Sequence, residues 1–138
     1  PTMTKSDSRA IAQFVRNAVA GEPIVLKSEG LQDRTWCYAT DAAAALLYIL
    51  LRGQSGEAYN VADARSRATV RAMAEKTAAA GGTQVVFAQP DAAEKAGFTP
   101  ITHAVLSAEK LQSLGWAPGV RLEEGLRATV RILREEIG

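Results

Sequence analysis

The run of ten apolar residues from Ala42 to Leu51 constrains the fold of this 138-residue chain more than any other feature. Thr40 or Asp41 can begin a helix here, and Arg52 followed by Gly53 marks its end. The run is about half as long as a helix that crosses a bilayer. A helix that is apolar on nearly every side is expected to be buried all round, between layers of a larger protein. In isolation it would expose an apolar face that aggregates or binds a partner.

The composition is that of an ordinary globular domain. Hydrophobic residues make up 47% and charged residues 22%, and the net charge of +1 gives no reason to expect a nucleic acid or a membrane as partner. A length of 138 residues fits a single domain. The polar residues 1–8 do not resemble a signal peptide, and the single cysteine, Cys37, excludes an internal disulfide. We therefore expect a cytoplasmic protein.

Hydrophobic spacing divides the chain into helices that alternate with short strands. The helices are expected at 11–19, 41–52, 70–80, 108–114 and 122–136. Gly21 ends the first helix, and Thr69 and Ser107 cap the third and the fourth. Strands are expected at 24–27, 34–38, 57–62 and 84–88, and the first two are candidates to pair with each other. This alternation indicates an α/β fold, or α+β for the isolated piece.

The usual signatures of catalysis are missing from the sequence. No G-x-G-x-x-G loop follows a strand, no G-x-x-x-x-G-K-[ST] phosphate loop occurs, and no tyrosine has a lysine four residues later. One histidine, His103, and one cysteine cannot assemble a zinc site. A hydrolase built on His103 would lack a paired nucleophile. The chain alone is therefore expected to be inactive, with no catalytic, cofactor-binding or metal-binding residue.

Three stretches carry the strongest functional signal. The first reads G-E-P-I-V-L at 21–26 and continues as G-x-Q-x-R-x-W-x-Y-x-x-D at 30–41. The second reads G-E-A-Y-N-V at 56–61, and the third runs from L-G-W-A-P at 114–118 to L-E-E-G-L at 122–126. In this order and spacing they resemble the C-terminal half of the extended short-chain dehydrogenase/reductase family, the NAD-dependent nucleotide-sugar epimerases and dehydratases.

The resemblance implies the C-terminal portion of an extended Rossmann-type fold, from which the N-terminal dinucleotide-binding part is absent. Residues 1–138 would form one substrate-binding portion. Within it, about 39–82 would pack on the missing Rossmann sheet, and 1–38 with 83–138 would form the cap domain over the substrate. The missing half would bind NAD and carry the catalytic tyrosine and lysine. Expected partners are that missing half and a nucleotide-sugar substrate, and a homo-oligomer is expected.

The resemblance also implies site residues. Arg34 corresponds to an arginine that contacts the diphosphate of the nucleotide sugar, and a guanidinium suits phosphate because it donates two parallel hydrogen bonds. Val25 and Lys27 lie on the strand that borders the nucleobase. His103 stands near the position where many family members have a second phosphate-binding arginine. The alternatives are a surface arginine at the start of a strand for Arg34 and an ordinary loop histidine for His103.

Other nearby residues have structural or open interpretations. Alternation along the strand places Arg34, Trp36 and Tyr38 on one face, where the two aromatic side chains are expected to pack. Asp41 is expected to cap the helix that follows, and Cys37 to be a small buried apolar residue. Lys5 and Arg9 could approach an anionic substrate, or could simply be solvated at the start of a helix.

Two functions remain open at this point. The first is the substrate-binding part of an NAD-dependent nucleotide-sugar epimerase or dehydratase, which holds the diphosphate while NAD oxidises the sugar. The alternative is a non-catalytic binding or interaction module that retains this half of the fold. A glycine-rich loop and a Tyr-x-x-x-Lys pair encoded upstream would favour the enzyme.

Overall fold

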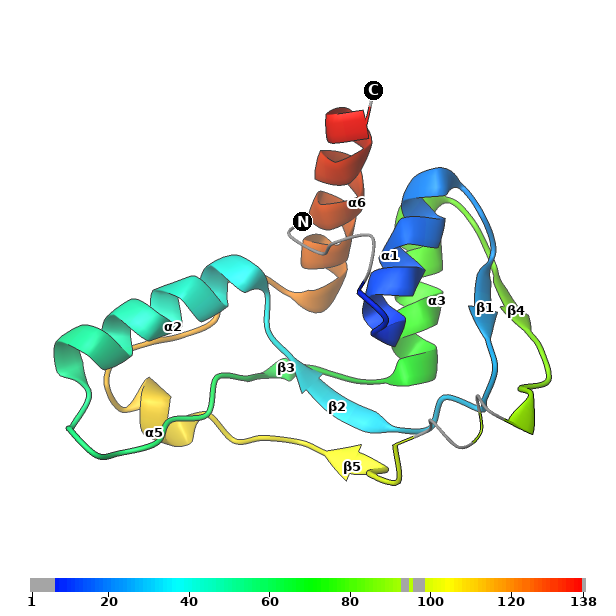
Figure 1. The fold of residues 1–138 in the computed structure, drawn as a ribbon. Helices are drawn as coiled ribbons and strands as arrows, with labels where there is room; N and C mark the ends of the chain where they lie inside the picture. Colours follow the sequence, from blue (N-terminus) through cyan, green and yellow to red (C-terminus); the bar gives the residue numbers. More distant parts are fainter. Residues whose placement is uncertain (1–6, 93–94, 96–98, 138) are drawn as a thin grey trace.

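The computed structural model describes residues 7–92, 95 and 99–137 and shows a mixed α/β chain (Figure 1). Its elements follow in this order: α1 (Ala10–Ala20), β1 (Ile24–Leu26), β2 (Asp33–Trp36), α2 (Ala39–Arg52), β3 (Asp63–Thr69), α3 (Val70–Gly81), β4 (Val85–Phe87), β5 (His103–Ala104), α5 (Glu109–Gln112) and α6 (Leu122–Ile137). The five predicted helices are confirmed within a few residues at each end. The predicted cap at Ser107 is wrong, because the residue before α5 is Ala108, which makes no side-chain cap hydrogen bond. Two other local signals are confirmed. Gly21 ends α1 in a left-handed conformation with φ of 73°. Thr69 caps α3 by accepting a hydrogen bond from the Ala72 amide at 3.1 Å.

The strands form two small sheets. β1 pairs with β4 in parallel, and β2 lies between β3, which is antiparallel to it, and β5, which is parallel. The predicted pairing of the first two strands is therefore wrong. The connection between β1 and β2 does not turn back as a hairpin, because its Gly30 and Gln32 carbonyls accept hydrogen bonds from Arg71 and Val70 at the start of α3. α3 then carries the chain to β4, beside β1.

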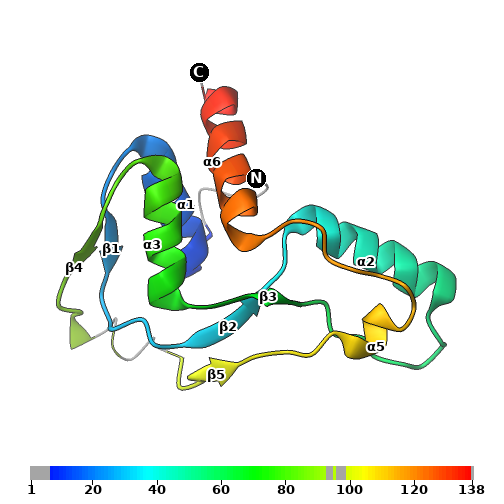
Figure 2. The same cartoon turned by 180° about the vertical axis from the view of Figure 1, so that it is seen from behind.

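The main core lies where α1, α3 and α6 pack on one another and on β1 (Figure 2). Phe14, Ile24, Met73, Ala78 and Val130 are among its buried side chains. α6 is amphipathic, and Leu126 and Val130 on its apolar side are buried in this core. This core fixes the place of α1 and β1, which line the cleft described below.

The C-terminal ends of α1 and α3 meet closely and are joined by one side chain of α6. A Cβ on Gly81 would lie 2.6 Å from the Ala18 carbonyl oxygen, so only glycine permits this approach. The Arg134 guanidinium donates hydrogen bonds to the Ala18 and Gly81 carbonyls at 2.8 and 2.7 Å, and to the Val19 carbonyl at 3.2 Å. These carbonyls lie at the negative ends of the two helices, where a cation is favourable.

A second, smaller core holds α2 against the segments around α5. Ala45, Ala62, Leu111 and Trp116 are buried in it, and the Trp116 indole nitrogen donates to the Asp41 carbonyl at 3.0 Å. The prediction that Asp41 caps α2 is wrong, because the helix begins at Ala39 and no side chain caps it. The Asp41 carboxylate instead accepts hydrogen bonds from the backbone amides of residues 119 and 120, at 3.0 and 2.9 Å.

The opposite side of α2 is an exposed leucine face. Leu46, Leu47, Leu50 and Leu51 are between 59% and 79% exposed, and only Ala45 of the helix is buried. Figures 1 and 2 show α2 and α5 reaching away from the group of α1, α3 and α6. The expected exposure of an apolar face in isolation is confirmed. No helix in the described ranges is both long and apolar enough to cross a membrane.

The strand predicted at 57–62 is wrong, because β3 begins only at Asp63. Residues before it run beside α2 and α5 without joining a ladder: the Asn60 side-chain amide donates to the Ser107 carbonyl at 3.2 Å, and the Tyr59 hydroxyl accepts from the Gln54 amide at 3.0 Å. A strand needs a neighbour, and the described residues place none there. The division of the chain at about 39–82 invokes a sheet outside this chain and stays a prediction.

Candidate functional site

A cleft of about 790 Å³ lies between the start of α1 and the end of β1. Val25, Lys27 and Arg34, three of the four residues predicted to contact a ligand, line it together. Its other polar lining residues are Ser8, Arg9, Gln13, Ser28, Gln32 and Thr99. Among the described residues, the lining thus contains three cationic side chains and no acidic one. Such a cleft favours an anion.

Arg34 is held in this cleft by two backbone carbonyls. Its Nη1 donates to the Asp33 carbonyl at 3.0 Å and its Nη2 to the Ile101 carbonyl at 2.8 Å. A guanidinium has five N–H donors in a rigid fork, so these two contacts leave others for a ligand. The side chain is half-buried, and one of its two partners, Ile101, lies 67 residues away in the sequence. Arg34 is therefore unlike a freely solvated surface arginine. Its role in binding stays a prediction.

His103 does not line the cleft. It is the first residue of β5 and lies opposite Asp33 in the register, so it shares the sheet face of Asp33, whereas the next residue, Arg34, points to the other face. The His103 Nδ1 is 3.4 Å from the Asp33 carboxylate, and the imidazole is 63% exposed. Arg67 donates to the same carboxylate at 2.8 and 2.5 Å and lowers the pKa of Asp33. The structure therefore separates His103 from Arg34.

Strict alternation along β2 also fails. The register shifts between Thr35 and Trp36, so Trp36 turns into the main core and donates to the Ala68 carbonyl at 3.3 Å. Tyr38 follows the strand and packs its ring on Gly125 of α6, where a Cβ would lie 2.6 Å from the ring. Both aromatic side chains serve packing, as predicted, but neither lines the cleft of Arg34.

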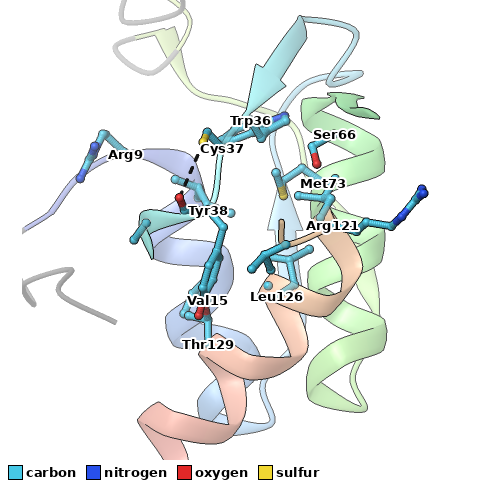
Figure 3. Close-up of a pocket in the computed structure, with 15 residues that line it drawn as sticks. Arg9, Val15, Trp36, Cys37, Tyr38, Ser66, Met73, Arg121, Leu126 and Thr129 are labelled. Carbon is cyan, nitrogen blue, oxygen red and sulfur yellow. Dashed lines mark hydrogen bonds between the residues drawn. The ribbon is translucent and has the colours of Figure 1, made fainter. Parts of the chain in front are cut away.

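A second cavity of about 320 Å³ lies between α1, α6 and the end of β2 (Figure 3). Val15, Met73 and Leu126 form apolar walls, and Cys37 lines it with its Sγ 3.7 Å from the Tyr38 carbonyl oxygen. Burial, with smaller effects of two aspartates, raises the pKa of the Cys37 thiol to about 11. The thiol therefore stays protonated near neutral pH and is a poor nucleophile. The described residues hold no group of three potential metal-ligating His, Cys, Asp or Glu side chains.

The structure adds Gln32 to the candidate residues. It belongs to the motif around Arg34, yet the sequence gives no reason to separate it from the other polar residues of that turn. The structure also places Arg9 in the cleft, which favours the interpretation that it approaches an anionic substrate. Its guanidinium also pairs with the Asp7 carboxylate at 2.6 Å. Lys5 lies outside the described residues.

Comparison with known proteins bears on the family. Residues 1–62 match the model of the NAD dependent epimerase/dehydratase family. The predicted resemblance to this family is confirmed. Among curated relatives, the chain is 30% identical over 136 residues to a dTDP-glucose 4,6-dehydratase of Neisseria meningitidis serogroup B, a match that covers 89% of the chain and 37% of the relative. It is 29% identical to the low-salt glycan biosynthesis protein Agl12 of Haloferax volcanii, covering 88% and 38%.

Solved structures of this family share the fold. The UDP-glucose 4-epimerase of Thermotoga maritima with UDP-glucose matches with a TM-score of 0.80 and 25% identity, over 97% of this chain and 42% of that chain. The dTDP-glucose 4,6-dehydratase of Bacillus anthracis with NAD matches with a TM-score of 0.75 and 24% identity, over 92% and 39%. The chain thus spans about two-fifths of the length of these relatives and solved structures.

Proposed function

We propose that this chain is the substrate-binding part of an NAD-dependent nucleotide-sugar epimerase or dehydratase, and that the cleft around Arg34 holds the diphosphate. The single observation that carries the proposal is the lining of this cleft, to which Arg9, Lys27 and Arg34 contribute cationic side chains. None of the described lining residues is acidic, and Asp7, which pairs with Arg9, lies outside the lining. Its relatives include dTDP-glucose dehydratases and a UDP-glucose epimerase, whose substrates contain a diphosphate. A diphosphate is an anion of the kind that a cationic cleft would bind.

In this proposal the residues of the chain bind and orient the substrate. The two carbonyls that hold Arg34 fix its guanidinium, so a diphosphate can accept two parallel hydrogen bonds from it at little further cost in side-chain entropy. Ser8, Arg9 and Ala10 line the same cleft at the N-terminal end of α1, where the helix adds partial positive charge. Val25 forms part of the apolar wall beside them. An anchored diphosphate limits where the sugar can lie, which favours reaction at one carbon.

NAD would supply hydride removal from the sugar in the whole enzyme, but the described residues do not fit it. A dinucleotide site needs a glycine-rich turn from a strand into a helix. Gly30 stands between two strands, while Gly21, Gly53 and Gly82 are each the residue that ends a helix. We therefore propose that NAD is bound by another part of the protein, in line with the relatives' greater length.

Alanine at Arg34 provides the test. Hydrogen bonds to charged groups contribute about 1.5–3 kcal/mol each, and solvent access to the cleft places this one at the lower end. We expect R34A to weaken binding of UDP and dTDP about tenfold, measured by isothermal titration calorimetry on this chain. Arg34→Lys should retain part of the affinity, because it keeps the charge but not the fork. Arg131→Ala, on the exposed side of α6, is the matched control. Equal affinities of R34A and the wild type would contradict the proposal.

We further propose that the leucine face of α2, formed by Leu46, Leu47, Leu50 and Leu51, is covered by the rest of the enzyme, and by a second copy when this chain is alone. Leu46 and Leu50 are 65% and 78% exposed and lie one helical turn apart, so they share one stripe. A contiguous apolar patch of this kind is unusual on a monomer.

Sedimentation velocity over a range of concentrations tests this interface. The wild-type chain is expected to form dimers or larger species, because association removes the leucine face from water. The double variant Leu46→Glu with Leu50→Glu is expected to remain monomeric. Leu31→Glu, a control at a loop leucine that is 64% exposed, should behave as the wild type. A wild-type chain that stays monomeric at high concentration would rule out self-association through α2.

A further inference from the structure

One buried polar atom is left unexplained by the packing of the chain. The side-chain oxygen of Gln32, Oε1, is buried and has no hydrogen-bond partner among the described residues. No other buried side-chain nitrogen or oxygen in the described ranges is left in this way. Gln32 also lines the cleft of Arg34. The orphaned oxygen and the candidate site therefore involve the same side chain.

An amide oxygen in this position is unfavourable for the folded chain. A buried carbonyl that has lost its water and gained no donor destabilises the structure, so nearly all such groups in native proteins are paired. The backbone of Gln32 has no such problem, because its carbonyl accepts a hydrogen bond from the Val70 amide at 3.0 Å. The polarity of the side chain is thus not needed to hold this segment on α3. An apolar side chain of the same length would serve the packing better.

The cleft offers the amide a partner when a ligand is present. The terminal torsion of a glutamine has a broad energy minimum, so its amide can rotate toward the cleft without moving the backbone. Two residues along an extended chain span about 6–7 Å and point to the same side, which places Gln32 one step from Arg34 along the cleft. If Arg34 holds a diphosphate, a group attached to that diphosphate lies within reach of Gln32.

We propose that Gln32 is a specificity residue that accepts a hydrogen bond from the nucleoside of a bound nucleoside diphosphate. The inference rests on the proposed function of the Arg34 cleft. The donor is a hydroxyl of the ribose or an N–H of the base, either of which can meet an amide oxygen. Binding relieves the orphaned oxygen, so the polar side chain lowers the stability of the free chain and raises its affinity for the ligand.

The test compares Gln32→Met with the wild type, using calorimetry with UDP and with inorganic pyrophosphate. Methionine keeps the length of the side chain and removes its acceptor. We expect Q32M to bind UDP about five- to tenfold more weakly, to bind pyrophosphate unchanged, and to unfold at the same or a higher temperature. If Gln32 had only a structural role, its replacement would not weaken the binding of UDP while leaving the binding of pyrophosphate unchanged. N3-methyl-UDP identifies the donor: a base N–H is indicated if Q32M and wild type bind it equally, and a ribose hydroxyl if they differ.

Three comparisons make the result decisive. Gln54→Met, the same change at an exposed residue outside the cleft lining, should leave both affinities unchanged. Gln32→Leu repeats the test if Q32M does not fold. Equal UDP affinity of a folded Gln32 variant and the wild type overturns this inference alone, provided that R34A still weakens both ligands. A wild-type chain that binds neither UDP nor pyrophosphate overturns the proposed function, and the role of Gln32 with it.

Discussion

Replacing Trp116 with alanine is expected to lower the free energy of unfolding by about 3–5 kcal/mol, the range for truncating a buried aromatic side chain. Trp116 is 2% exposed and lies in the second core, with Ala45 and Leu111. Its indole nitrogen also donates to the Asp41 carbonyl. One side chain thus fills the core between α2 and α5 and joins the segment after α5 to the first turn of α2 by a hydrogen bond. Its loss should therefore weaken the packing of α2 and of that segment.

Urea unfolding followed by far-ultraviolet circular dichroism measures this effect. Trp116→Phe should lower the free energy of unfolding less than W116A does, because the phenyl ring keeps most of the volume although the indole hydrogen bond is lost. Phe87→Ala is the control for an aromatic truncation at a site that is 57% exposed, and should cost under about 1 kcal/mol. If W116A were as stable as the wild type, the second core would contribute little, and α2 would be held by other contacts.

Replacing Gly81 with alanine is expected to destabilise the chain by about 1–3 kcal/mol, the usual range for overpacking. The added Cβ would lie 2.6 Å from the Ala18 carbonyl oxygen and 2.7 Å from the Ala18 Cβ. Neither is the flexible end of a long side chain, so α1 and α3 would have to separate. Their separation would also lengthen the hydrogen bonds of Arg134 to both helices, since a single guanidinium joins them.

The same urea experiment tests the close approach of the two helices. Gly119→Ala is the matched control, because its added Cβ would meet only the Asp41 carboxylate oxygen at 3.6 Å, an ordinary contact. We expect G119A to stay within about 0.5 kcal/mol of the wild type. A G81A variant as stable as G119A would show that α1 and α3 can shift apart without loss.

Much of the fold was predictable because its signals are local. The cap at Thr69 and the left-handed glycine at residue 21 act within one turn of their own helices, and the structure has both. The strands at 24–26 and 85–87 were predictable from apolar runs, but not their pairing, because β1 and β4 lie about 60 residues apart and meet only through α3. The expected strand at 57–62 failed for the complementary reason: its sequence is suitable, but no neighbour lies beside it.

The candidate site divides in the same way. The motif that contains Arg34 indicated the family, and comparison confirmed that resemblance. The separation of His103 from Arg34 could be found only from the register of β5 on β2. This register places His103 opposite Asp33, on the sheet face that Arg34 does not share. The orphaned oxygen of Gln32 could not be predicted at all, because burial of a single atom depends on everything packed around it.

The apolar run from Ala42 to Leu51 separates what can be predicted from the sequence from what depends on tertiary packing. The sequence by itself determined that it forms a helix and that this helix needs cover, since composition and local propensity suffice for both. The tertiary structure alone decided which side is covered: Ala45 faces Trp116 and Leu111, while Leu50 remains 78% exposed. Hydrophobic burial has no direction of its own. The partners that the rest of the chain brings into place decide which face is buried.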